Sequence, residues 1–195
     1  VPISAIILGG RRTQLIPLVV ESFDWRQGVF MGARSGSETT AAAIHQVGAL
    51  RRDPMAMIPF CGYNMGDYFA HWLSMGSRLR HPPRIFTANW VRVDDEGAFI
   101  WPGFGDNIRV LKWIIDRLGS RVGARETPIG LVPHARDLEL AGLAIPREKL
   151  KTLLEVRRKD WRQEARDIGA FLDQFGAHLP PEVREEYKKF AAAVQ

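Results

Sequence analysis

A short, almost continuous apolar run near the start of the chain constrains its fold more than any other feature. Ile3 to Leu8 (ISAIIL) ends in the pair Gly9-Gly10, which is followed by Arg11 and Arg12. Such a run is typical of a buried strand, and in open α/β sheets ligands bind just beyond the strand ends. Two guanidiniums there suit a phosphate or a carboxylate. A surface turn with ordinary arginines explains the same residues equally well.

A second segment suits a flat ligand. Trp101 to Asn107 (WPGFGDN) lies between a predicted strand, Ile85 to Val93, and a predicted helix, Ile108 to Leu118, which Asp106 or Asn107 can cap. Glycines let backbone approach a planar group, rings can stack on it, and the helix start offers free N–H groups. A nucleobase fits this description. Taken alone, however, these residues favour a tight turn with core aromatics.

The rest of the pattern predicts an α/β chain with a helical end. Short strands are expected at Leu15 to Val20 and at Gly28 to Ala33, and Thr127 to Leu140 is expected to be extended. Asn64 can cap a helix that runs to Met75, with Gly76 at its C-terminal end. Prolines that can open the helices of the tail stand at Pro146 and at Pro180-Pro181.

Composition narrows the classes of protein. A length of 195 residues suffices for one domain, or for one domain with a small appendage. The single cysteine, Cys61, excludes an internal disulfide framework and suits a reducing compartment. We expect no membrane span and no signal peptide. Because the chain begins at Val1 and not at Met, we expect it to be cut from a longer sequence. The net charge of +5 weakly favours anionic partners.

Several familiar reaction centres are missing from the sequence. One cysteine and five scattered histidines give no zinc-ligand spacing, and there is no Gly-x-Ser-x-Gly motif. The glycine turn after Leu8 is not a Walker A loop. The residues therefore offer binding parts without a reaction centre.

Six stretches, in order along the chain, resemble one family. They are ISAIILGGRR, GVFMGA, SETTAAA, DPMAMIPFCGYNMGDYFAHWL, WPGFGDN and RVLKW, and together they resemble the C-terminal part of GTP-dependent phosphoenolpyruvate carboxykinase. The likeness runs from residue 1 to about residue 140 and continues more loosely through the tail, for example in WRQE at Trp161 to Glu164. Each motif alone is weak, whereas six in order are specific.

The resemblance implies an α/β fold with a mixed sheet flanked by helices and a helical C-terminal tail. It implies that residues 1–140 form the α/β part of a nucleotide-binding domain and that residues 141–195 form a helical segment of the same domain. The implied enzyme is a decarboxylating lyase of gluconeogenesis, which converts oxaloacetate and GTP to phosphoenolpyruvate, GDP and CO2. It would be cytoplasmic and monomeric at full length, without nucleic-acid or membrane partners.

The resemblance also implies Mn²⁺ at the active site and Mg²⁺ with the nucleotide. In the family, the metal ligands and the phosphate loop would precede Val1, so this segment holds no metal ligand and would be inactive alone. Arg11 matches the catalytic arginine that contacts the transferring phosphate. Phe104 would stack on guanine, Asn107 would bind its edge and Phe99 would pack edge-on. The guanine loop, 99–107, contributes Phe99, Phe104, Gly105, Asp106 and Asn107.

The small-residue segment from Arg34 to Leu50 buries little apolar area, which suits a mobile lid or a short alanine helix. Residues 37–49 match the family's lid, which closes over substrate. Taken alone, His45 within it is more readily incidental than catalytic. The lid residues carried over are Ser37, Glu38, Thr39, Thr40, Ala41, Ala42, Ala43 and His45.

The sequence departs from the family pattern at several positions. Val91 stands where the family usually has a second stacking Phe, Asp106 replaces Glu, and Ile108 replaces a small Ser. Lid residues 44–48 also differ from the common pattern. The effect of Val91 on stacking is left open by the sequence. An alternative from another class is a non-catalytic α/β module that binds nucleic acid or a protein through its basic surface.

Overall fold

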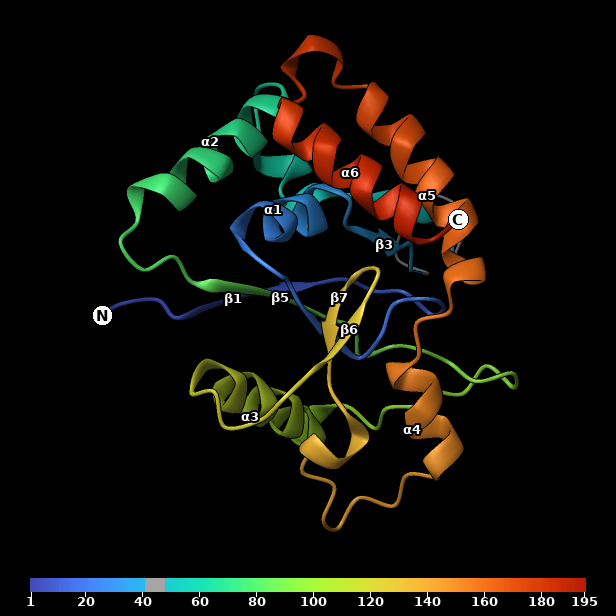
Figure 1. The fold of residues 1–195 in the computed structure, drawn as a ribbon. Helices are drawn as coiled ribbons and strands as arrows, with labels where there is room; N and C mark the ends of the chain where they lie inside the picture. Colours follow the sequence, from blue (N-terminus) through green and yellow to red (C-terminus); the bar gives the residue numbers. More distant parts are fainter. Residues whose placement is uncertain (41–47) are drawn as a thin grey trace.

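The computed structural model describes residues 1–40 and 48–195. A mixed five-stranded sheet with the order β1-β5-β2-β7-β6 lies in the middle of the molecule (Figure 1). β1 and β5 are parallel, and the other neighbouring strands are antiparallel. The strands of this sheet are β1 Ala5–Gly9, β2 Val19–Glu21, β5 Arg84–Ala88, β6 Arg125–Thr127 and β7 Gly130–Val132.

Helices cover both faces of the sheet. Figure 1 shows α1, α2, α5 and α6 above it, and α3 and α4 below it. The helices are α1 Trp25–Ala33, α2 Met65–Arg78, α3 Asn107–Leu118, α4 Arg147–Leu154, α5 Arg158–Asp173 and α6 Pro181–Ala193. A separate two-stranded hairpin pairs β3 Gly36–Glu38 with β4 Leu50–Arg52. This layout confirms the expected α/β class, with a mixed sheet flanked by helices and a helical tail.

Each face of the sheet has its own apolar core. The first contains Phe30 of α1, Phe69 of α2 and Trp161 of α5, which are almost completely buried. The second contains Trp101 and Trp113, which pack below the sheet. Burial of such large side chains supplies most of the driving force for the layered fold. The described residues include no helix with both the length and the apolar character that a membrane crossing requires.

The strand predicted at Gly28 to Ala33 is wrong, because these residues belong to helix α1. The Asp24 side chain accepts a hydrogen bond from the Gln27 backbone N–H at 2.8 Å and so caps the helix. Its residues Gly28 to Ala33 are all buried and apolar, and the helix packs against β5, α2 and α6, so this stretch has no polar face that would show a helical period. Gly28 permits this close packing, since a Cβ there would lie 2.6 Å from Ile85 Cδ1.

Two other expectations also need correction. α2 does not end before Gly76 but continues to Arg78, and Gly76 faces the Trp25 ring, where a Cβ would clash. The connection predicted over Thr127 to Leu140 contains the hairpin of β6 and β7, which turns through Gly130 at φ 132°. Only glycine adopts such a backbone readily, and this turn was not recognised in the sequence.

Candidate functional site

The turn after β1 is held firmly beside the end of β5. Asn89, which is fully buried, donates from Nδ2 to the carbonyls of Arg12 and Ile16 at 2.8 and 3.0 Å. Its Oδ1 accepts from the Arg12 backbone N–H at 3.2 Å. Gly10 N–H donates to the Ala88 carbonyl at 3.3 Å. One buried amide therefore fixes the backbone that carries Arg11 and Arg12.

The β3–β4 hairpin packs onto this same turn. The Arg11 N–H donates to Ser37 Oγ at 3.1 Å, and the Glu38 N–H donates to the Arg11 carbonyl at 2.8 Å. Gly36 lies so close to β4 that a Cβ would stand 2.8 Å from the Arg51 carbonyl oxygen. The first residues of the predicted lid are thus attached directly to the arginine turn.

A cavity of about 450 Å³ lies between the turn, the hairpin and the loop after β5. It brings together Arg11 and four of the predicted lid residues, and adds Arg51, Trp90 and Val91. Arg11 is exposed, and the Arg51 side chain is 63% exposed although it also pairs with Asp53. Two accessible guanidiniums around one cavity favour a phosphate-like anion. The lid residues in its wall are Ser37, Glu38, Thr39 and Thr40.

The two adjacent arginines after β1 face different environments. Arg11 lines the cavity, whereas Arg12 Nη1 and Nη2 donate to Glu164 Oε1 and Oε2 of α5 at 3.0 and 3.1 Å. Arg52 Nη1 also donates to Glu164, at 2.8 Å. Burial raises the pKa of Glu164, but Arg12 and Arg52 outweigh it and lower this pKa to about 2. Arg12 is therefore committed to a structural ion pair.

Sequence reasoning missed Arg51 and Arg52 altogether. They form a second pair of adjacent arginines, on β4. As with Arg11 and Arg12, one residue of the pair faces the cavity and the other binds Glu164. Arg51 lines the cavity, while the Arg52 side chain is 11% exposed and binds Glu164. Neighbouring residues of a strand point to opposite faces, so the adjacent arginines of β4 already carried this signal. The sequence pattern did not, however, predict a strand at Leu50–Arg52.

The two aromatic side chains of WPGFGDN, Trp101 and Phe104, differ in their exposure to solvent. The Trp101 side chain is 1% exposed, and its Nε1 donates to Asn107 Oδ1 at 2.9 Å. Phe104 is 98% exposed and has φ 41°, directly after Gly103 at φ 74°. A bulky residue with positive φ is a conformational outlier that costs energy. The segment therefore anchors one ring in the core and holds the other out in solvent.

Asp106 is the N-cap residue of α3, as expected, but its side chain makes no capping hydrogen bond. A short 3₁₀ turn, Phe104–Asp106, runs straight into the helix and supplies its first turn instead. Asp106 Oδ1 accepts from Arg109 Nε at 2.8 Å, and Arg109 Nη1 donates to the carbonyls of Glu139 and Ala141. The loop is thereby tied to the start of the tail.

The guanine-loop residues do not line the 450 Å³ cavity, although the two regions are connected. Val93 N–H donates to the Thr13 carbonyl at 3.0 Å, and Val93 forms a β-bridge with Phe99. Phe99 is 66% exposed. Val93 thus links Thr13, in the segment after the arginine turn, to Phe99 of the guanine loop. Four of the predicted lid residues lie outside the described residues: Ala41, Ala42, Ala43 and His45.

The described residues do not fit a metal ion. In residues 1–40 and 48–195 no group of three or more His, Cys, Asp or Glu side chains could hold one. The acidic groups near the cavity are already engaged, because Glu38 accepts from the Thr13 N–H at 2.9 Å and Asp53 pairs with Arg51. No chemical step is therefore assigned to a metal held by these side chains.

Comparison with known proteins gives a consistent result. The chain matches the profile of the phosphoenolpyruvate carboxykinase C-terminal P-loop domain over residues 1–193. It is 49% identical over 180 residues to a phosphoenolpyruvate carboxykinase [GTP] of Anaeromyxobacter dehalogenans, which covers 92% of this chain and 30% of the relative. It is 50% identical over 188 residues to the protein of that name from Thermoplasma volcanium, covering 96% and 31%.

A third relative with the same printed name comes from Chlamydia muridarum. It is 50% identical over 190 residues, which cover 97% of this chain and 32% of the relative. The chain thus spans about a third of the length of the curated relatives that it matches.

Proposed function

The chain belongs to the phosphoenolpyruvate carboxykinase C-terminal domain family, and from this premise we propose that it supplies the guanine-nucleotide site of a GTP-dependent phosphoenolpyruvate carboxykinase. The whole enzyme would convert oxaloacetate and GTP to phosphoenolpyruvate, GDP and CO2. In this proposal residues 1–140 carry the nucleotide site and residues 141–195 complete the same domain. A nucleic-acid or protein-binding module is not favoured, because the named relatives are enzymes.

In this proposal, different residues bind the phosphates and the guanine base of the nucleotide. Arg11 would contact the transferring phosphate, since its side chain lines a cavity large enough for a polyphosphate. A guanidinium stabilises the charge of a loose phosphoryl-transfer transition state. The lid residues Ser37 to Thr40 would exclude water when the lid closes. Any Mn²⁺ or Mg²⁺ would be held by residues other than 1–40 and 48–195 of this chain.

The guanine base would lie at the loop before α3. Phe104 would stack on one face, Phe99 would meet the base edge-on, and Asn107 would bind its edge. Because Trp101 donates to Asn107 Oδ1, the Asn107 amide is held in a fixed orientation, with its NH2 group left to face a ligand. Gly105 adds no side chain and would leave the backbone accessible. Edge contacts of this kind select guanine over adenine, whereas stacking does not.

One observation carries the proposal above all. Phe104 places a large ring almost entirely in solvent, at a backbone angle that costs energy. A chain gains nothing in stability from this arrangement, since the ring is not buried and the angle is unfavourable. Stacking of Phe104 on a flat ligand recovers the apolar area and accounts for the conformation.

Titration of the full-length protein with GDP tests the assignment. We expect Phe104→Ala to weaken GDP binding by about 1–3 kcal/mol, the range measured for base–aromatic stacking. Asn107→Ala should weaken GDP binding more than ADP binding. Ile115→Ala is the matched control, because Ile115 is a half-exposed apolar residue on α3, the helix that begins at Asn107. If neither variant loses affinity for GDP, the guanine site lies elsewhere.

A further inference from the structure

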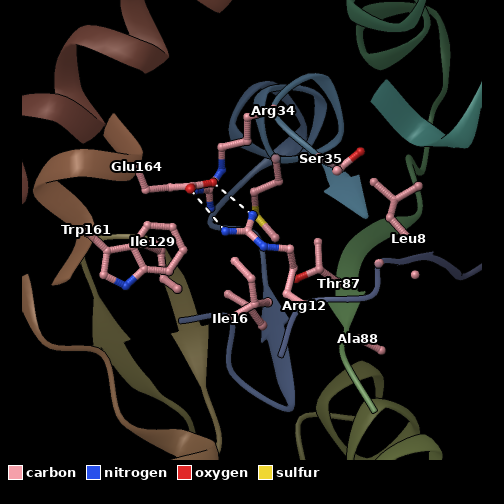
Figure 2. Close-up of a pocket in the computed structure, with 15 residues that line it drawn as sticks. Leu8, Arg12, Ile16, Arg34, Ser35, Thr87, Ala88, Ile129, Trp161 and Glu164 are labelled. Carbon is pink, nitrogen blue, oxygen red and sulfur yellow. Dashed lines mark hydrogen bonds and ion pairs between the residues drawn. The ribbon is translucent and has the colours of Figure 1, made fainter. Parts of the chain in front are cut away.

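A second cavity shares the Gly9-Gly10 turn with the candidate nucleotide cavity but opens between the sheet and α5 (Figure 2). It has a volume of about 50 Å³. Figure 2 shows the charged ends of Arg12, Arg34 and Glu164 converging there, with Trp161 and Ile129 to one side and Leu8 to the other. The proposed function gives this cavity no role.

The charges around this cavity do not balance. Arg12, Arg34 and Arg52 surround Glu164, and Glu38 lies 3.9 Å from Arg12 Nε. Three guanidiniums thus face two carboxylates, although the side chains of Arg12, Arg52 and Glu164 are only 12%, 11% and 8% exposed. Buried charge without a counter-charge is costly, so a further anion would stabilise this cluster.

Of the three arginines, Arg12 and Arg52 form ion pairs with carboxylates, whereas Arg34 forms none with the described residues. Its guanidinium carbon lies 4.9, 5.1 and 5.4 Å from the ring centres of Phe190, Trp161 and Phe30. Its Nε is buried and finds no hydrogen-bond partner among the described residues, as is also true of Arg12 Nε. Three rings hold the cation in place by cation–π attraction but leave its Nε–H donor unsatisfied. Burial lowers the pKa of Arg34 to about 10, so it stays charged at neutral pH.

We propose that this cavity binds a small monocarboxylate anion, with its carboxylate against the unpartnered Nε–H groups of Arg34 and Arg12 and its short apolar end against the opposite wall. One negative charge matches the single excess guanidinium, and carboxylate oxygens can accept from the two unpartnered Nε–H groups. Most of the wall is apolar, which favours an organic anion over a halide or phosphate. The apolar lining includes Leu8, Ile16, Val20, Met31, Ile129 and Trp161.

The volume limits the size of this anion. A water molecule needs roughly 10–15 Å³ measured in the same way, so 50 Å³ admits about four non-hydrogen atoms. Acetate has that size and is therefore the probe of choice. Its binding does not require a nucleotide, so this proposal stands or falls independently of the guanine site.

Thermal unfolding of the full-length protein in acetate tests the proposal, with chloride replacing acetate at constant ionic strength. Because a ligand of the folded state raises the melting temperature, we expect a saturable rise with acetate. Neither chloride nor butyrate, which is too long, should reproduce it. In saturation-transfer NMR, the acetate methyl protons should receive magnetisation from the wall. Absence of acetate binding, or an equal effect of chloride or butyrate, would overturn the proposal.

A variant identifies the site of binding. Arg34→Met keeps an apolar stem against the three rings but removes the charge, and it should weaken acetate at least tenfold. Arg26→Met is the matched control, since Arg26 lies near the other end of α1 and its side chain, 43% exposed, pairs with Glu185. Undiminished acetate affinity in Arg34→Met contradicts the proposal. If Arg34→Met does not fold, the NMR measurement on the unmodified protein decides alone.

Discussion

Arg12 binds both carboxylate oxygens of Glu164 through a fork of two hydrogen bonds, 3.0 and 3.1 Å long, across 152 positions of sequence. This pair joins the turn after β1 to helix α5 of the tail. Since the neighbouring Arg11 lines the candidate nucleotide cavity, the tail helps to position the proposed phosphate contact without touching it. The turn after β1 therefore carries both a structural ion pair, through Arg12, and the proposed phosphate contact, through Arg11.

Glu164→Gln should destabilise the protein strongly, because it leaves the buried Arg12 and Arg52 without their carboxylate. Breaking a buried ion pair by removing one partner costs roughly 3–5 kcal/mol. Urea unfolding at neutral pH measures this loss. Glu185→Gln serves as the control, since the Glu185 side chain is 58% exposed in its pair with Arg26 and should cost less than about 1 kcal/mol. Equal effects of the two changes would contradict a structural role for Glu164.

The contribution of Glu164 should also depend on pH in one direction. Its pKa is lowered from the ordinary 4.5 to about 2 in the folded protein. A carboxyl group with a lowered folded-state pKa stabilises the protein above its unfolded pKa and loses that effect as the pH falls. We therefore expect the difference in unfolding free energy between wild type and Glu164→Gln to shrink from pH 5 toward pH 2. A difference that stays constant over this range would refute the assigned pKa.

The two rings of WPGFGDN should respond oppositely to truncation. Trp101→Ala should cost roughly 3–5 kcal/mol of stability, because it empties a buried site and removes the bond to Asn107. Phe104→Gly should leave stability unchanged or raise it by up to about 1 kcal/mol, since glycine accepts the positive φ. Phe104→Gly should nevertheless weaken GDP binding. A large loss of stability in Phe104→Gly would show that the ring packs against protein.

Gly36→Ala should disturb the hairpin that carries the lid residues. A Cβ at this position would meet the Arg51 carbonyl oxygen at 2.8 Å, so β3 must move away from β4. We expect a loss of about 1–3 kcal/mol in stability, as for other overpacked sites, together with weaker GDP binding. Gly62→Ala is the control, because nothing lies within 4 Å of the added Cβ. Normal GDP binding in Gly36→Ala would separate the hairpin from the nucleotide site.

Local patterns in the sequence predicted those elements whose signals are local. Asn64 caps α2 as expected, with Oδ1 accepting from the Gly66 N–H at 2.8 Å, and the amphipathic pattern of α3 gave its range almost completely. Residues 28–33 of α1 were predicted as a strand because all six are buried and apolar, so this stretch has no polar face that reveals a helical period. Whether these residues form a helix or a strand depends on tertiary packing, which the local sequence pattern does not report.

The candidate site was predictable in part for the same reason. Arg11 follows a recognisable strand and glycine turn, and it does line a cavity. The different fates of Arg11 and Arg12 could not be predicted, because they depend on Glu164 of α5, far along the chain. Arg34 was missed since its surroundings, three rings from α1, α5 and α6, exist only in the folded protein.

Val91→Phe should strengthen GDP binding. Val91 is half-buried and lines the candidate cavity, at the position where the family resemblance leads us to expect a second stacking ring. If valine leaves one face of the base open, a phenylalanine ring should add about 0.5–1.5 kcal/mol of affinity, or roughly two- to tenfold. Isothermal titration of the full-length protein with GDP measures the gain, and Ile115→Phe controls for added apolar surface on a nearby helix. Unchanged or weaker binding in Val91→Phe would mean that the site has repacked around valine and holds the base from one side.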